Sequence, residues 1–100
     1  MNNQKKFGQT IRNYRKAKDL LLRQLAAAFE VDTTFISKME RDEKQATRVH
    51  VERLPIILKV AYDELLTIWI SDKLLNTLKP EPSAYNALKL TEKRLKTKAL

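Results

Sequence analysis

The stretch LAAAFEVDTTFISKMER, residues 25–41, decides the fold of this chain. Its apolar spacing predicts two short helices, over about 22–29 and 33–41, that meet at a tight turn. Asp32 precedes the second helix, where its carboxylate can accept backbone N–H groups of the first turn. The second helix should face inward with Ile36 and Met39, and outward with Thr33, Thr34, Ser37 and Lys38.

The pattern of this stretch leaves two interpretations open. A helix with small polar side chains and one cation on its outer, N-terminal face suits entry into a DNA major groove, where such side chains reach base edges. An ordinary helical hairpin with a solvated face would show the same spacing.

Composition indicates one small all-α domain with an appendage. The 100 residues are 43% hydrophobic and include one Gly, three Pro and no Cys. A chain of this size can bury a core without metal or disulfide support. Scarce Gly and abundant helix formers favour helices throughout. No apolar run approaches the roughly 18 residues of a membrane-spanning helix, and the polar N-terminus, whose first five residues we expect to be disordered, does not look like a signal peptide.

The charge is strongly positive. Twenty Lys and Arg against 12 Asp and Glu give a formal net charge of +8, and the pI is near 9.9. Such a balance favours a polyanionic partner, with nucleic acid first among them. A charged surface that only maintains solubility, or one that meets an anionic membrane, is the alternative.

Apolar stripes on both sides of the two-helix motif predict three more helices, over about 6–18, 48–59 and 63–78. The domain would then span residues 6–78, with the motif at about 22–41. The last of these helices is apolar on two sides, and both need to be covered. We expect one side to cover the core and the other to form a homodimer, to which the end of the preceding helix would add. The expected interface residues are Leu65, Ile68, Trp69 and Leu75.

Residues 79–100 form a separate segment. Lys79-Pro80-Glu81-Pro82 breaks the chain, and a basic amphipathic helix should follow. Its apolar stripe would pack on the preceding helix, within one chain or across a dimer; its basic side would add nonspecific attraction to DNA; or the helix would bind a partner protein. The stripe consists of Tyr85, Leu88, Leu95 and Ala99.

Nothing in the sequence indicates an enzyme, a metal site or a cofactor. His50 is the only histidine, and no Cys or nearby carboxylate pair completes a metal site around it. Ser37 and Ser71 have no partner base at a suitable spacing, and no Gly-rich phosphate loop is present.

Taken together, residues 7–75 resemble the lambda-repressor-like, Cro/C1 or XRE-type helix-turn-helix family. The family pattern is approximately L-A-x-x-x-G-V-S-x-x-x-I-S-x-x-E-x-G. Residues 11–20 are similar to the family's first helix, and residues 63–66 to the start of its fifth. The matching positions of the central pattern are Leu25-Ala26, Val31-Asp32, Ile36-Ser37, Glu40 and Asp42.

The resemblance implies a five-helix DNA-binding domain whose third helix lies in the major groove. Arg15 and Glu40 fall on the positions of a family-typical ion pair that joins the first helix to the third. The positions that commonly face base edges are Thr33, Thr34, Ser37 and Lys38. Positions expected to meet phosphate are Arg41, Lys44 and Arg48.

The sequence departs from the family at several positions. Leu22 stands where a phosphate-binding Gln is common, so Arg23 or the helix N-terminus would replace that contact. Glu30 and Asp42 stand where the family has Gly, and a left-handed Glu30 would cost on the order of 1 kcal/mol. Phe35 occupies a position that is usually small or polar. It would touch a thymine methyl group or the sugar backbone, or pack on the second helix.

The leading interpretation is therefore a sequence-specific transcriptional regulator, cytoplasmic and associated with the bacterial nucleoid, that binds a palindromic operator of double-stranded DNA as a homodimer, including at its own promoter. Residues 20–41 and 70–75 also resemble regulators linked to DNA-modification operons. The alternatives are an antitoxin whose C-terminal helix engages a toxin, and a basic helical adaptor for acidic partners or membrane surfaces.

Overall fold

The computed structural model describes residues 6–99, and the side chains of residues 6–98. The expected disorder of residues 1–5 and the expected role of the Ala99 side chain lie outside this part. Within it the chain is all-α, with no strand. The six helices are α1 (Phe7–Ala17), α2 (Leu22–Phe29), α3 (Thr33–Glu40), α4 (Arg48–Leu58), α5 (Tyr62–Leu78) and α6 (Ala84–Ala99).

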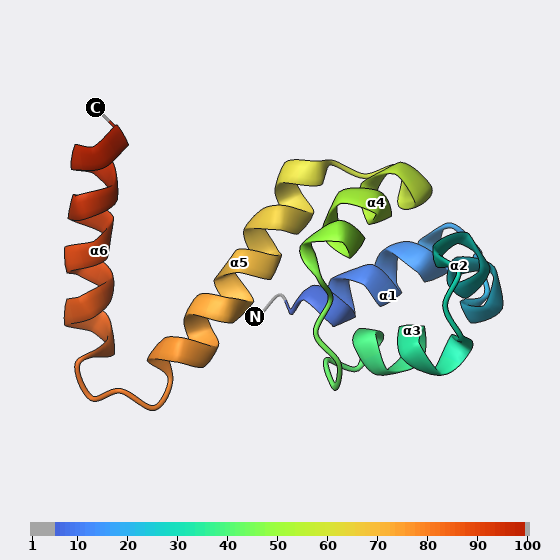
Figure 1. The fold of residues 1–100 in the computed structure, drawn as a ribbon, viewed down its shortest axis with the longest axis horizontal. Coiled ribbons are helices and arrows are strands. Elements are labelled where there is room, and N and C mark those ends of the chain that lie inside the picture. Colours follow the sequence, from blue (N-terminus) through green and yellow to red (C-terminus); the bar gives the residue numbers. More distant parts are fainter. Residues whose placement is uncertain (1–5, 100) are drawn as a thin grey trace.

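Helices α1 to α5 surround one hydrophobic core, and α6 stands apart from it (Figure 1). Each of the five helices contributes apolar side chains to this core, because one face of each is turned toward the others. The largest fully buried side chains are Ile11, Leu25, Ile36, Met39, Val51, Leu54, Leu58 and Leu65.

The single glycine lets α1 approach the C-terminal end of α3. A Cβ atom on Gly8 would lie 2.2 Å from the backbone oxygen of Met39 and 2.8 Å from that of Glu40. Neither backbone oxygen can move aside cheaply, so a side chain here would force the two helices apart.

The N-terminus of α1 is capped by carboxylates from distant parts of the chain. The Phe7 N–H donates to Asp72 of α5 at 2.8 Å, and the Gly8 N–H donates to Asp42 at 3.0 Å. Burial, together with repulsion from Asp42, raises the pKa of Asp72 against the opposing effects of the Phe7 N–H and Lys6. These bonds satisfy two of the N–H groups that a helix start leaves free.

Non-glycine residues in the left-handed conformation follow each of the first four helices. Their φ angles are 57° at Asp19, 59° at Glu30, 61° at Asp42 and 57° at Lys59. Glu30 and Asp42, which stand where the family has Gly, both adopt the left-handed conformation. The conformation lets the chain turn sharply after a helix, at roughly 1 kcal/mol per residue.

The two apolar sides of α5 are divided differently from the expectation. Leu65, Ile68 and Trp69 are 0%, 8% and 6% exposed, because they pack in the core of a single chain. These three side chains have almost no surface left for a second subunit to contact. The prediction that they form a dimer interface is therefore wrong for this structure. Leu75 alone of the four expected residues is exposed, at 49%; the outer side of α5 also carries exposed Ile70 and Leu74.

Helix α6 is not covered by the rest of the described chain. Its large apolar side chains are exposed, with Tyr85 at 81% and Leu95 at 63%. The radius of gyration is 15.6 Å, against about 13 Å for a compact chain of 100 residues. The expected packing of α6 on α5 within one chain is therefore absent from this structure (Figure 1).

Candidate nucleic-acid interface

The exposed side of α3 carries the residues expected to read DNA. Asp32 caps the helix by accepting the Phe35 N–H at 2.8 Å, which fixes where the helix begins. At 100° per residue, the outer side chains fall within an arc of about 140°, opposite buried Ile36 and Met39. The side chains in that arc are Thr33, Thr34, Ser37, Lys38 and Arg41, and all but the partly covered Ser37 are exposed.

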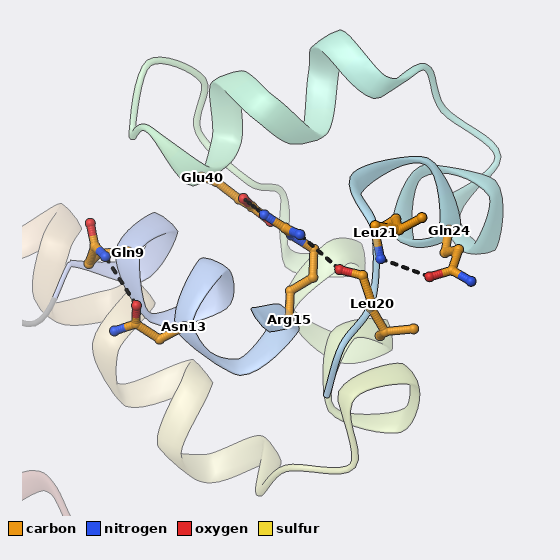
Figure 2. A network of polar contacts seen from close by, with 7 residues as sticks. All are labelled: Gln9, Asn13, Arg15, Leu20, Leu21, Gln24 and Glu40. Carbon is orange, nitrogen blue, oxygen red and sulfur yellow. Dashed lines mark hydrogen bonds and ion pairs between the residues drawn. The ribbon is translucent and has the colours of Figure 1, made fainter. Parts of the chain in front are cut away.

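A buried ion pair joins the inner side of α3 to α1, at the positions that the resemblance implied. Figure 2 shows Arg15 donating to both oxygens of Glu40, from Nε at 2.7 Å and from Nη2 at 3.0 Å. Arg15 also donates to the backbone oxygen of Leu20 at 2.8 Å. The two residues are 8% and 5% exposed. One side chain thus holds both α3 and the α1–α2 connection, so the motif is oriented as a unit.

The N-terminus of α2 lacks the side chain that commonly meets phosphate in this family. Leu22 is partly buried against the core, and Gln24 uses its Oε1 atom to accept the Leu21 N–H at 2.7 Å (Figure 2). Arg23 is exposed beside it. Arg23 and the free N–H groups of this helix end are therefore the available donors for a phosphate.

The loop between α3 and α4 is anchored by the core tryptophan. The indole Nε1–H of Trp69 donates to the backbone oxygen of Ala46 at 2.9 Å, which satisfies the polar end of a buried ring. The guanidinium of Arg48 lies 5.5 Å from the centre of the same ring. Trp69 thus positions the segment that carries Lys44 and Arg48, two of the expected phosphate contacts.

The side chains of the expected phosphate contacts after α3 are exposed. Arg41 pairs with Glu43 at 3.1 Å, and both side chains are more than half exposed, so the pair can open to a phosphate at little cost. The Lys44 ammonium lies 5.8 Å from the Phe35 ring centre. The structure therefore gathers Arg41, Lys44 and Arg48 around the end of α3 and the start of α4.

Phe35 packs inward, in an aromatic cluster that the sequence did not reveal. Its ring lies 5.1 Å from that of His50, and the Phe29 ring lies 5.6 Å from His50 on another side. The cluster joins α2, α3 and α4 behind the outer face of α3. Phe35 is partly buried against the core and His50 of α4, and its contact with a thymine methyl group or the sugar backbone stays a prediction.

His50 also completes the cap of α4. Thr47 Oγ1 accepts the His50 N–H at 3.4 Å, and His50 Nδ1 accepts the Thr47 N–H at 3.1 Å. Only a neutral imidazole can accept at Nδ1. Burial, and then the charge of Arg53, lower the pKa of His50, which favours that neutral form. The only histidine is thus a structural group of the motif.

These features define a class of protein, a helix-turn-helix DNA-binding domain with its recognition helix exposed. A family model described as helix-turn-helix matches residues 11–65, more than half of the chain. The chain therefore belongs to the Cro/C1-type, XRE-like helix-turn-helix family of DNA-binding transcription regulators.

Comparison with curated proteins and with solved structures found no match. Among the described residues, no helix has the length and apolar character needed to cross a membrane. The same part of the chain contains no group of three or more His, Asp or Glu residues arranged to hold a metal ion.

Proposed function

We propose that the protein is a sequence-specific regulator that binds a two-fold-symmetric operator as a homodimer. The observation that carries the proposal is the outer side of α3, where small polar side chains and Lys38 stand exposed on a helix fixed from behind by the buried Arg15–Glu40 pair. Rigid placement matters because base readout needs donors and acceptors held at hydrogen-bond distance.

Roles can be assigned to the exposed side chains. Lys38 would donate to guanine O6 and N7, and Ser37 would contact a neighbouring base. Of Thr33 and Thr34, in the first turn of α3, one would serve a phosphate because the helix dipole favours an anion there. Contacts to the backbone would come from Arg23, Arg41, Lys44 and Arg48.

Exposed apolar side chains away from this surface support self-association. Ile56 at the end of α4 is exposed, as are Ile70, Leu74 and Leu75 on the outer side of α5. Patches of this kind mark interaction sites in soluble proteins. A two-fold dimer would place two recognition helices about 34 Å apart, and the regulator would act at its own promoter, in the cytoplasm on nucleoid DNA. Association with a DNA-modification operon rests only on the resemblance of residues 20–41 and 70–75.

Selection of bound sequences from random duplex DNA tests the proposal. We expect a two-fold-symmetric consensus whose half-sites lie about one helical turn apart. A consensus without two-fold symmetry would contradict binding as a dimer. Recovery of DNA with no common sequence would contradict sequence-specific binding. Lys38→Ala, run in parallel, should relax one base pair in each half-site while the rest of the consensus persists.

The antitoxin alternative is favoured by one observation, the uncovered apolar side of α6. A toxin would occupy that side in the way that amphipathic helices enter hydrophobic grooves. A partner encoded beside this protein and purified with it, released by Leu88→Glu, would support that role.

A further inference from the structure

Two apolar faces of the described chain remain uncovered, and they lie on consecutive helices. The outer side of α5 carries Ile70 and Leu74, and exposed Leu75 lies at its edge, toward a hollow that Phe7 and Trp69 also line. One side of α6 carries Tyr85, Leu88 and Leu95 at a spacing of three and seven residues. We propose that these faces pair between two copies of this chain, so that α6 of each copy covers α5 of the other.

The connection between the helices keeps α6 away from α5 of its own chain. The Glu81 N–H donates to the backbone oxygen of Leu78 at 2.9 Å, and the Ala84 N–H donates to the backbone oxygen of Glu81 at 3.3 Å. Pro80 and Pro82 fix their own φ angles and limit the residues before them. The connection is thus a structured pair of turns that holds the two helices splayed, as Figure 1 shows.

The two helices match in length and in charge. They have 17 and 16 residues, or about 25 Å each at 1.5 Å per residue. In an antiparallel pair that sets Leu74 against Leu88, the basic end of α6, with Lys96 and Lys98, lies beside the acidic start of α5 at Asp63. Opposite charges at that end favour this direction over the parallel one.

The area available suits a dimer of two identical chains. The exposed fractions of the six apolar side chains correspond to roughly 600 Å² per chain, and two copies of the contact would bury about 1,200 Å², which reaches the lower limit for a stable interface. A second copy supplies both faces at once, so no further partner is needed to cover either of them.

This pairing rests on the proposed dimeric regulator and names the surface that would join its two copies. It differs from an interface made only by the end of α4, where Ile56 is exposed. It also assigns to α6 the work of holding the dimer, instead of contact with DNA.

The absence of cysteine from the chain permits a clean crosslinking test. One full-length copy carries Leu74→Cys and a second, distinguishable by a tag, carries Leu88→Cys. Mixing them with a short bis-maleimide, whose reach suits the 8–10 Å between packed helices, should give a crosslinked heterodimer. A chain with both substitutions should crosslink mainly to other chains. Crosslinks confined within single chains, or none at all, would overturn the pairing.

A matched pair of substitutions tests the same face by sedimentation. Leu88→Glu should weaken self-association at least tenfold, whereas Leu90→Glu, on the opposite side of α6, should leave it unchanged. Buried Trp69 reports by its fluorescence that the core of each variant remains folded. Equal effects of the two variants, dissociation by Ile56→Glu but not by Leu88→Glu, or a monomeric wild-type protein would each refute the exchange of α6.

The selected operator separates this inference from the proposed function. If Leu88→Glu is monomeric and binds a single half-site with reduced affinity, both are supported. If the protein binds a symmetric operator while α6 crosslinks only within one chain, the proposed function is supported and the exchange of α6 is refuted. If α6 crosslinks between chains and no DNA sequence is selected, the proposed function is refuted and the exchange of α6 is supported.

Discussion

Helices α3 and α6 are both amphipathic, yet the chain treats them in opposite ways. The apolar side of α3 is buried by α1, α2 and the core, its start is capped by Asp32, and its end is held by the Arg15–Glu40 pair. The apolar side of α6 meets no comparable partner in the described chain, and its one ion pair, Glu92–Lys96 at 3.8 Å, is exposed. An amphipathic pattern therefore indicates that one side of a helix is suited to a contact, but it does not indicate whether the same chain supplies that contact.

The largest expected effect is on the free energy of unfolding, when a glutamate of α3 and a glutamate of α6 are each replaced by alanine. Glu40→Ala leaves the Arg15 guanidinium buried without its partner and should cost about 3–5 kcal/mol of unfolding free energy. Glu92→Ala should cost nothing measurable, because its pair is exposed. Thermal unfolding checks both, and a double-mutant cycle of Arg15 and Glu40 should show strong coupling. Similar losses for the two glutamates would contradict the contrast between the helices.

A single added methyl group tests how closely α3 is packed. Gly8→Ala places a Cβ against the backbone oxygens of Met39 and Glu40, and overpacking of this kind costs about 1–3 kcal/mol. The neighbouring Gln9→Ala, on the exposed side of α1, serves as the control and should leave the denaturant midpoint nearly unchanged. An unaltered midpoint for Gly8→Ala would show that the two helices are not in close contact.

A third comparison sets a lysine of α3 against one of α6. Lys38→Ala should lose about 1–3 kcal/mol of operator binding and relax preference at one base pair. Lys93→Ala, on α6, should leave the preference intact. Titrations of the operator and of single-base variants measure both, at two salt concentrations. A loss for Lys38→Ala that is equal on every sequence, with a salt slope lower by about one, would make Lys38 a phosphate contact.

Relief of backbone strain should stabilise the domain that surrounds α3 and leave α6 unaffected. Lys59→Gly removes the cost of a left-handed side chain after α4, where φ is 57°, and should add about 1 kcal/mol of stability. This corresponds to a rise in melting temperature of about 4–8 °C for a domain of this size. A destabilised variant would mean that the Lys59 side chain makes a larger contribution than its backbone strain removes.

The smallest effect concerns pH and the cluster behind α3. The lowered pKa of His50 means that the folded state binds its proton less tightly than the unfolded state, whose histidine titrates near 6.5. This residue leaves stability unchanged above that pH and reduces it as the pH falls below. His50→Gln keeps an acceptor for the Thr47 N–H and does not titrate. Urea unfolding between pH 7 and 5 should therefore show a flatter decline for the variant than for the wild type.

Local patterns account for what could be read from the sequence. The helix positions, the cap at Asp32 and the outward side chains of α3 depend on neighbours within about four residues, and such neighbours are visible in a sequence. The partnership of Arg15 and Glu40 was available only through the resemblance to a family. Nothing local indicates that Asp72 caps α1, since 65 residues separate it from Phe7.

The amino-acid sequence is enough to predict an all-α chain, a third helix with a polar outer face, and a basic balance suited to DNA. Tertiary structure alone decided which side of α5 the core would cover, that Phe35 would turn inward to His50, and that α6 would be left open. The physical reason is that periodicity states only how many sides of a helix are apolar. Which of those sides is covered depends on the packing of elements far apart in the chain, and for α6 the proposed cover is a second copy.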